Sequence, residues 1–345
     1  MPVKIAVVGA GIIGLTTAVK AIETLENVDI TILADKFTPE TTGDVAAGFF
    51  NPYILKGVPE EKVRYKKTRE THKRNSAQPT TILFVSPFRD WCVQTFDFYL
   101  ELLRSANSYN LGLCLIPAYL LETKWIPRPL HADAFLHYRD LTAKELQAFP
   151  SKYKYGAFVV SMIIECKRFL PYLMQRFRRR GGRLKTYKVQ NLEELRSSFD
   201  IVINCSGVGA GAITPDDLIK PVRGQTIRVH APWIKYVVVG GEDFHVIPNI
   251  DNVMLGGTKD VDNWSLVPDP KIRDRIWNGC LELVPSLKNA TITEEAVGLR
   301  PGRNPVRIEM EEEPSRALTK KLTIIHNYGH GGSGITVCWG CADDQ

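Results

Sequence analysis

Three glycines near the N-terminus have the spacing of a phosphate-binding turn. Gly9, Gly11 and Gly14 form the pattern G-x-G-x-x-G, and Asp35 follows about twenty residues later. In such a turn the first glycine allows a tight bend, the second lets a pyrophosphate approach the backbone, and the third lets a helix pack closely on a strand. The acid receives a ribose hydroxyl. The pattern therefore predicts a bound dinucleotide, but it does not choose between FAD and NAD.

A second glycine-rich stretch, Gly329–Gly334, follows an apolar run at Leu322–Ile325 near the end of the chain. Glycines this dense permit positive φ angles and expose backbone N–H and C=O groups to a ligand. A flexible surface loop is the alternative. His326 and His330 have the spacing of a metal pair, but they lie on no predicted helix and have no nearby glutamate, so we expect no metal site.

Two arginines, Arg300 and Arg303, lie in a segment punctuated by glycine and proline, Gly298–Arg303. A guanidinium binds a carboxylate through two parallel hydrogen bonds, although a surface ion pair is the alternative role. Cys338 and Cys341 have C-x-x-C spacing without the second pair that zinc needs or the helix start of a redox site. We interpret them as structural thiols.

The elements that must position these residues follow from the apolar pattern. A strand at Val3–Val8, a helix at Ile12–Leu25 and a strand at Val28–Leu33 make one βαβ unit, which implies a parallel sheet. A helix at Lys167–Arg180 and a strand near Ile201–Asn204 repeat the pattern. Four alternating runs, Gln225–His230, Tyr236–Val239, Phe244–Ile247 and Val253–Gly256, favour a largely antiparallel sheet in an inserted second domain.

Composition and charge exclude several classes of protein. The 345 residues are 44% hydrophobic and 24% charged, which is typical of a globular chain. The net charge of +6 comes mostly from Glu60–Arg74, which holds seven basic and three acidic residues, so we expect no nucleic-acid partner. The apolar N-terminus is interrupted by Lys4 and Lys20, so we expect neither a signal peptide nor a membrane span.

Six motifs together resemble the D-amino-acid oxidase and D-aspartate oxidase family. They are Gly9–Gly14, Thr41–Gly48, Pro221–Gln225, Ala231–Trp233, Gly298–Pro301 and Ile325–Gly332. The resemblance covers nearly the whole chain and implies an α/β fold: a Rossmann-like FAD-binding domain with an interleaved α+β substrate domain that carries a mostly antiparallel sheet. The expected bounds are 1–55, 155–215 and 295–345 for the FAD-binding domain, 85–154 and 216–294 for the substrate domain, and 56–84 for an insertion or exposed loop.

The resemblance also implies residue roles. Arg300 matches the arginine that binds the substrate α-carboxylate, and Gly332 matches the glycine whose carbonyl receives the amino group. Asn51, His245 and Ser333 are expected beside them. The expected FAD contacts are Gly9, Ala10, Gly11, Ile12, Gly14, Asp35, Lys36, Thr41, Thr42, Gly43, Ala47, Gly48, Phe49, Val189, Ser206, Gly331, Gly332, Ser333, Gly334, Ile335 and Thr336.

The activity that the resemblance implies is the FAD-dependent oxidation of D-amino acids by oxygen to 2-oxo acids, ammonia and hydrogen peroxide. No side-chain base is required, so catalysis depends on orientation and on the flavin. We expect neutral substrates, with basic ones as a further option, because Val237–His245, a segment expected to act as a lid, offers Glu242 and Asp243 but no Arg or Lys. D-Aspartate oxidation by the same chemistry is the alternative, followed by an impaired or non-enzymatic flavin-binding relative.

Three departures from the family pattern carry expectations of their own. His245 stands where the family has a tyrosine, and we expect its charge to vary near neutral pH. Residues 56–79 are expected to be an insertion. The chain ends at Gln345 without a peroxisomal tripeptide, so the peroxisomal location that the resemblance implies competes with a cytoplasmic one. A homodimer is a further expectation.

Overall fold

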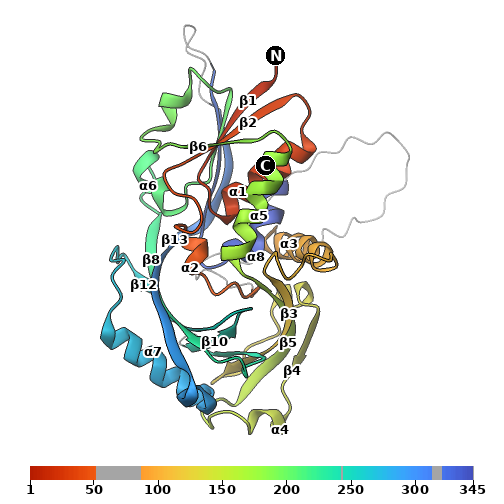
Figure 1. Cartoon of the computed structure of the whole chain (residues 1–345), viewed down its shortest axis with the longest axis vertical. Coiled ribbons are helices and arrows are strands. Elements are labelled where there is room, and N and C mark those ends of the chain that lie inside the picture. The colour runs from red at the N-terminus through yellow and green to blue at the C-terminus, as the bar shows by residue number, and fades with distance from the viewer. Residues whose placement is uncertain (52–86, 242–243, 313–320, 345) are drawn as a thin grey trace, which may run out of the picture.

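The computed structural model describes residues 1–51, 87–241, 244–312 and 321–344, and Figure 1 shows their arrangement. One sheet of 14 strands forms the centre, in the order β4-β5-β3-β9-β10-β11-β8-β13-β14-β7-β1-β2-β6, with β12 paired to β8. The strands are β1 Val3–Val8, β2 Val28–Ala34, β3 Leu113–Glu122, β4 His137–Asp140, β5 Tyr155–Ile164, β6 Arg183–Thr186, β7 Ile201–Asn204, β8 Lys220–His230, β9 Val237–Gly240, β10 Phe244–Pro248, β11 Val253–Gly256, β12 Asp260–Val261, β13 Thr291–Glu312 and β14 Thr323–His330. The helices are α1 Ile12–Thr24, α2 Thr42–Val45, α3 Pro87–Leu103, α4 Ala143–Leu146, α5 Cys166–Arg179, α6 Ala210–Ile213, α7 Pro270–Leu283 and α8 Gly334–Asp343.

The parallel half of the sheet contains β14, β7, β1, β2 and β6, and each neighbouring pair among them is parallel. Helices α1, α5 and α8 gather beside these strands (Figure 1), and their apolar side chains pack with those of β1 and β2 in the largest core cluster. The βαβ unit expected from the first 33 residues is confirmed, with β1 at Val3–Val8 as predicted. This half matches the Rossmann-like arrangement implied by the sequence.

The antiparallel half contains β4, β5, β3, β9, β10, β11 and β8, and only the β3–β9 pair among these is parallel. The four predicted runs between 225 and 256 correspond to β8, β9, β10 and β11. Helix α7 packs against this half and buries Ile276, Cys280 and Leu283 in a second core cluster. The predicted lid segment is therefore the β9–β10 hairpin, although Glu242 and Asp243 lie outside the described residues.

Strand β13 joins the two halves, and it runs along most of the molecule in Figure 1. Its first part pairs with β8 from Thr291 to Gly302, and its second part pairs with β14 from Gly302 to Glu312. Arg300 lies just before this change of partner. A boundary at residue 295 would cut the strand, and the proposed domain limits stay predictions.

Two further expectations concern particular segments. The C-terminal strand extends to His330, so the first glycine of the Gly329–Gly334 stretch is part of β14 and not of a loop that follows a strand ending at Ile325. The reason is that β13 continues to pair with β14 as far as His330. The expected insertion at 56–84 lies outside the described residues. No helix in the described part of the chain is long and apolar enough to span a membrane.

Candidate active site

The glycine turn after β1 brings three backbone segments into close contact. Gly9 has a φ of +110°, and a Cβ there would come within 2.4 Å of the carbonyl oxygen of Cys205. A Cβ on Gly14 would come within 2.0 Å of the carbonyl oxygen of Gly9. The turn, helix α1 and the end of β7 can approach this closely only because both positions lack a side chain.

The N-terminus of α1 remains open to a ligand. Its N-cap is Gly11, which has an extended conformation, and a Cβ there would meet nothing within 4 Å in the part of the chain that the structure describes. The start of α8 lies beside it, because a Cβ on Gly334 would contact Ile12 and Ile13. Two adjacent helix N-termini with free N–H groups favour an anion. The cradle therefore fits the pyrophosphate of FAD.

The other expected FAD contacts lie near the same edge of the parallel half. Asp35 and Lys36 follow β2 and are exposed, Val189 follows β6 and is buried, and Ser206 follows β7. The carboxyl ends of parallel strands meet at one edge of a sheet, where α/β proteins bind their ligands. The remaining contacts lie on α2 and the residues after it (Thr41, Thr42, Gly43, Ala47, Gly48, Phe49) and around the start of α8 (Gly331 to Thr336). Their contact with FAD stays a prediction.

Arg300 lies on β13 between the two halves of the sheet, and contacts with Thr258 and Gly224 fix its guanidinium. Its Nη1 donates to the carbonyl oxygen of Thr258 at 2.8 Å, and its guanidinium lies over Gly224, where a Cβ would come within 2.5 Å of Nη1. Burial lowers the pKa of Arg300, but an arginine stays charged in a protein. A partly buried, oriented guanidinium is suited to a carboxylate.

The second expected catalytic position lies close to Arg300. The N–H of Gly331 donates to the carbonyl oxygen of Pro301 at 2.8 Å, which ties the start of the Gly331–Thr336 segment to the residue after Arg300. The hydroxyl of Thr336 donates to the carbonyl oxygen of Asn51 at 3.3 Å. The structure thus links Arg300, Gly332 and Asn51 through short segments of backbone. Ser333 is buried at the N-cap of α8.

His245 lies on β10 opposite Gly256 of β11, with its ring against Gly256 and Gly257. The loss of water around the ring and the nearby charge of Arg300 lower the pKa of His245 to about 4. The expectation that its charge varies near neutral pH is therefore wrong, because the imidazole is neutral throughout that range. It retains one N–H donor and one acceptor.

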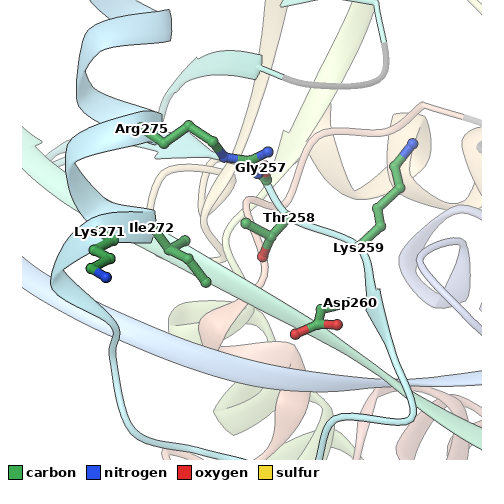
Figure 2. Close-up of a pocket in the computed structure, with 7 residues that line it drawn as sticks. All are labelled: Gly257, Thr258, Lys259, Asp260, Lys271, Ile272 and Arg275. Carbon is green, nitrogen blue, oxygen red and sulfur yellow. Dashed lines mark hydrogen bonds between the residues drawn. The ribbon is translucent and has the colours of Figure 1, made fainter.

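Lys259 is a candidate site residue that the sequence interpretation missed. Partial desolvation and the charge of Arg300 lower its pKa to about 8, which indicates that the two cations are close together. Figure 2 shows its side chain pointing away from helix α7, whereas Arg275 reaches from α7 toward Gly257. Arg275 donates to the Gly257 carbonyl at 3.3 Å and lines a cavity of about 570 Å³ with Lys259 and Lys271.

The expectation of a neutral substrate rests on the charges of Val237–His245, and Lys259 lies beyond the next strand. A lysine three residues after the strand that pairs with His245 is the available signal, but it depends on knowing that β10 and β11 form a hairpin. Gly224 was missed for the same reason, since only the β8–β13 register places it beneath Arg300.

Arg303 forms an ion pair, but the pair is mostly buried and not on the surface as the alternative for the two arginines expected. Its Nε donates to Asp216 Oδ2 at 2.7 Å, and that carboxylate also accepts from the Tyr328 hydroxyl at 2.5 Å. These bonds lower the pKa of Asp216 against the opposing effect of burial. Arg303 is therefore part of a structural ion pair, and Arg300 is the arginine available for a substrate.

The thiols and histidines of the C-terminal motifs are buried. Cys338 and Cys341 lie on α8 as free cysteines, and burial raises the pKa of Cys338 to about 11, so it is a protonated thiol at neutral pH. His326 and His330 lie on β14, and burial lowers the pKa of His330 to about 3. Within residues 1–51, 87–241, 244–312 and 321–344, no group of three or more histidine, cysteine, aspartate or glutamate side chains could hold a metal ion.

The parallel half of the sheet carries an anion-binding glycine turn, and the strand that joins the two halves carries an oriented arginine. This combination defines a dinucleotide-dependent enzyme of the α/β class. The family model for FAD dependent oxidoreductases matches residues 4–344, so the chain belongs to that family and FAD is its cofactor. It is 41% identical to a D-amino acid oxidase of Dugesia ryukyuensis over 99% of this chain and 95% of the relative. It is 35% identical to a D-aspartate oxidase of Homo sapiens over 98% and 92% of the two chains.

Solved structures support the same fold at low sequence identity. Glycine oxidase from Bacillus cereus superposes with a TM-score of 0.71 at 14% identity, covering 99% of this chain and 93% of that one. The FAD-bound L-alpha-glycerophosphate oxidase of Mycoplasma pneumoniae gives a TM-score of 0.67 at 13% identity, covering 100% and 94%. The fold is thus that of FAD-dependent oxidoreductases.

Proposed function

We propose that this chain oxidises D-amino acids with neutral side chains to 2-oxo acids, with ammonia and hydrogen peroxide as the other products. The observation that carries the proposal is the position of Arg300, a charged guanidinium fixed by Thr258 and tied through Pro301 to the Gly331–Thr336 segment. The D-amino acid oxidase and D-aspartate oxidase among the relatives support the substrate class. Oxygen is the proposed second substrate.

The residues of the chain would bind and orient the substrate. Arg300 would bind the α-carboxylate, and the carbonyl of Gly332 would accept a hydrogen bond from the α-amino group. His245 would offer one neutral donor beside the carboxylate. When bound, FAD supplies the hydride acceptor for the α-hydrogen. With the carboxylate and the amine both fixed, only one enantiomer directs its α-hydrogen toward the cofactor, so orientation accounts for most of the catalysis.

The test is an oxygen-consumption or peroxide assay of the purified flavoprotein against matched D- and L-amino acids. Activity with neutral D-amino acids and none with their L-enantiomers is expected. Arg300→Met should lower kcat/KM by about a hundredfold or more, and Arg300→Lys should recover part of it, because a lysine keeps the charge but not the two parallel donors. A flavin-loaded protein that oxidises no D-amino acid would leave the impaired or non-enzymatic flavoprotein as the explanation.

Lys259 favours a second candidate, the oxidation of acidic D-amino acids. Lys259 places a cation close to Arg300 that would attract a second carboxylate, and the β9–β10 hairpin was not expected to supply such a cation. The neutral and acidic candidates differ only in this side-chain contact. A comparison of D-alanine with D-aspartate therefore separates them.

Assembly and location stay predictions. We propose a homodimer, which light scattering coupled to size exclusion checks directly. A peroxisomal location follows from the family resemblance alone, and fractionation of the source cells would test it against a cytoplasmic one.

A further inference from the structure

The segment that carries α2 is too short to hold its own position. Helix α2 has only four residues, Thr42–Val45, and Asp44 closes it locally by accepting from the N–H and hydroxyl of Thr41. The residues after it, Ala47 and Gly48, are among the expected FAD contacts. Four residues are well below the length at which a helix is stable alone. Contacts from elsewhere must therefore fix the segment.

Two side chains from the antiparallel half bind the backbone of this segment. Arg228 of β8 donates from Nη2 to the carbonyl oxygen of Asp44 at 3.2 Å. Asn249, which follows β10, donates from Nδ2 to the carbonyl oxygen of Ala47 at 2.9 Å. Two bonds to carbonyls on either side of the helix end fix the orientation of the segment as well as its position.

The side chains of Arg228 and Asn249 also form a hydrogen bond with each other. Nη1 of Arg228 donates to Asn249 Oδ1 at 3.2 Å and to Asn252 Oδ1 at 3.1 Å. Its Nε lies 3.5 Å from Glu294 Oε2. The Arg228 residue is only 3% exposed, and a buried guanidinium is costly unless it is bonded in this way. The arrangement is therefore preformed.

We propose that Arg228 and Asn249 form a carbonyl clamp that positions the Asp44–Gly48 segment for FAD from the substrate side of the molecule. They are positioning residues, because they act through the backbone of the segment. The clamp depends on the FAD binding of the family and holds whichever amino acid is oxidised. A failure to oxidise D-amino acids would leave the prediction about FAD affinity intact.

Arg223 provides a matched control on the same strand. It is 2% exposed, and it donates to the carbonyls of Ser265 and Val267 and to the Gln225 side chain. None of these partners belongs to the α2 segment. Since Arg223 and Arg228 are five positions apart, they lie on opposite faces of β8. Both arginines are buried on β8, so replacing either one with methionine introduces the same apolar side chain at a comparable buried position.

The experiment measures the FAD dissociation constant by flavin fluorescence on enzyme stripped of FAD and reloaded, together with the thermal midpoint and the visible circular dichroism of the bound flavin. Arg228→Met should raise the dissociation constant about tenfold, because the Asp44 carbonyl loses a charged donor. It should also change the flavin dichroism. Arg223→Met should change the thermal midpoint by a similar amount and the dissociation constant less than twofold. Equal changes in FAD affinity for the two variants would overturn the proposal.

Two further variants keep the test decisive if Arg228→Met folds poorly. Asn249→Ala removes the bond to Ala47 alone and should raise the dissociation constant about threefold. Arg228→Lys should recover part of the affinity, because a lysine can donate to one of the carbonyl and amide acceptors but cannot span them. At saturating FAD the kcat of each variant should return to within threefold of the wild type. A kcat that stays tenfold low at saturating FAD would contradict a role in cofactor positioning.

Discussion

The parallel and antiparallel halves of the sheet position their functional groups by different means. In the parallel half, close backbone contact at Gly9 and Gly14 leaves the helix N-terminus free for an anion. At the antiparallel half, side chains from separate strands converge, with His245 on β10 and Arg300 on the joining strand β13. The first arrangement depends on a local run of glycines that packs against Cys205 at the end of β7, and the second depends on strand register. Substitutions should therefore affect the two halves in distinct ways.

The largest expected effect is in the parallel half, at Gly14. Gly14→Ala places a Cβ 2.0 Å from the Gly9 carbonyl oxygen, a backbone atom that cannot move aside, and should cost about 3 kcal/mol of unfolding free energy or more. Gly11→Ala is the matched control, because a Cβ there meets no atom of the described residues within 4 Å. It should keep the stability of the FAD-free protein and weaken FAD binding at least tenfold. Denaturant unfolding and FAD titration measure the two effects, and equal losses of stability would contradict the distinction.

The next effect is in the antiparallel half, at Gly224. Gly224→Ala places a Cβ 2.5 Å from Arg300 Nη1 and should displace the guanidinium. Misplacing such a group by about 1 Å costs up to about a hundredfold in kcat/KM, so a fall of at least tenfold is expected with the FAD content unchanged. In an Arg300→Met background the same change should cost little. Additive losses in the double variant would show that Gly224 acts independently of Arg300.

The sequence predicted the parallel half better than the antiparallel half, because the first depends on a local pattern and the second on strand register. The glycine spacing, the two flanking strands and the acid after the second strand lie within 35 residues, so local pattern alone predicted the βαβ unit and its binding edge. Arg300 was found because its own segment is distinctive. Lys259, Gly224 and Arg228 were not, because each matters only through a partner on another strand.

His245 shows a second property that the sequence alone does not predict, the protonation state of a side chain. The family resemblance places it at the site, but does not predict its protonation state. An isolated histidine titrates near neutral pH, and only the surrounding Gly256, Gly257 and Arg300 show why this one does not. Burial and neighbouring charge are properties of the assembled sheet.

The Lys259 prediction tests whether the antiparallel half recognises a second carboxylate. In the wild type the ratio of kcat/KM for D-aspartate to that for D-alanine should fall as pH rises through about 8, because Lys259 is charged below that pKa and neutral above it. The ratio removes the titration of the amino group common to both substrates. Lys259→Met should lower the ratio about fivefold at pH 7 and remove its pH dependence.

Lys271→Met is the matched control for Lys259. Lys271 lines the same cavity but belongs to α7, and Figure 2 shows it on the side of the cavity opposite Lys259. It should leave the ratio unchanged. A ratio that is flat with pH in the wild type and unaffected by Lys259→Met would eliminate the acidic candidate and leave the neutral one.

The smallest expected effect is at His245 of β10, in the antiparallel half. His245→Phe removes one neutral hydrogen-bond donor and should lower kcat/KM for a neutral D-amino acid about threefold. Because the pKa of His245 is about 4, the ring is neutral from pH 6 to pH 8, so the ratio of wild-type to variant kcat/KM should be constant over that range. Protonation would enter only below about pH 5, where a second cation beside Arg300 should strengthen carboxylate binding by the wild type. An inflection of the ratio near pH 6.5 would mean that the imidazole is solvated, and that the antiparallel half is more open to water than its packing against Gly256 and Gly257 indicates.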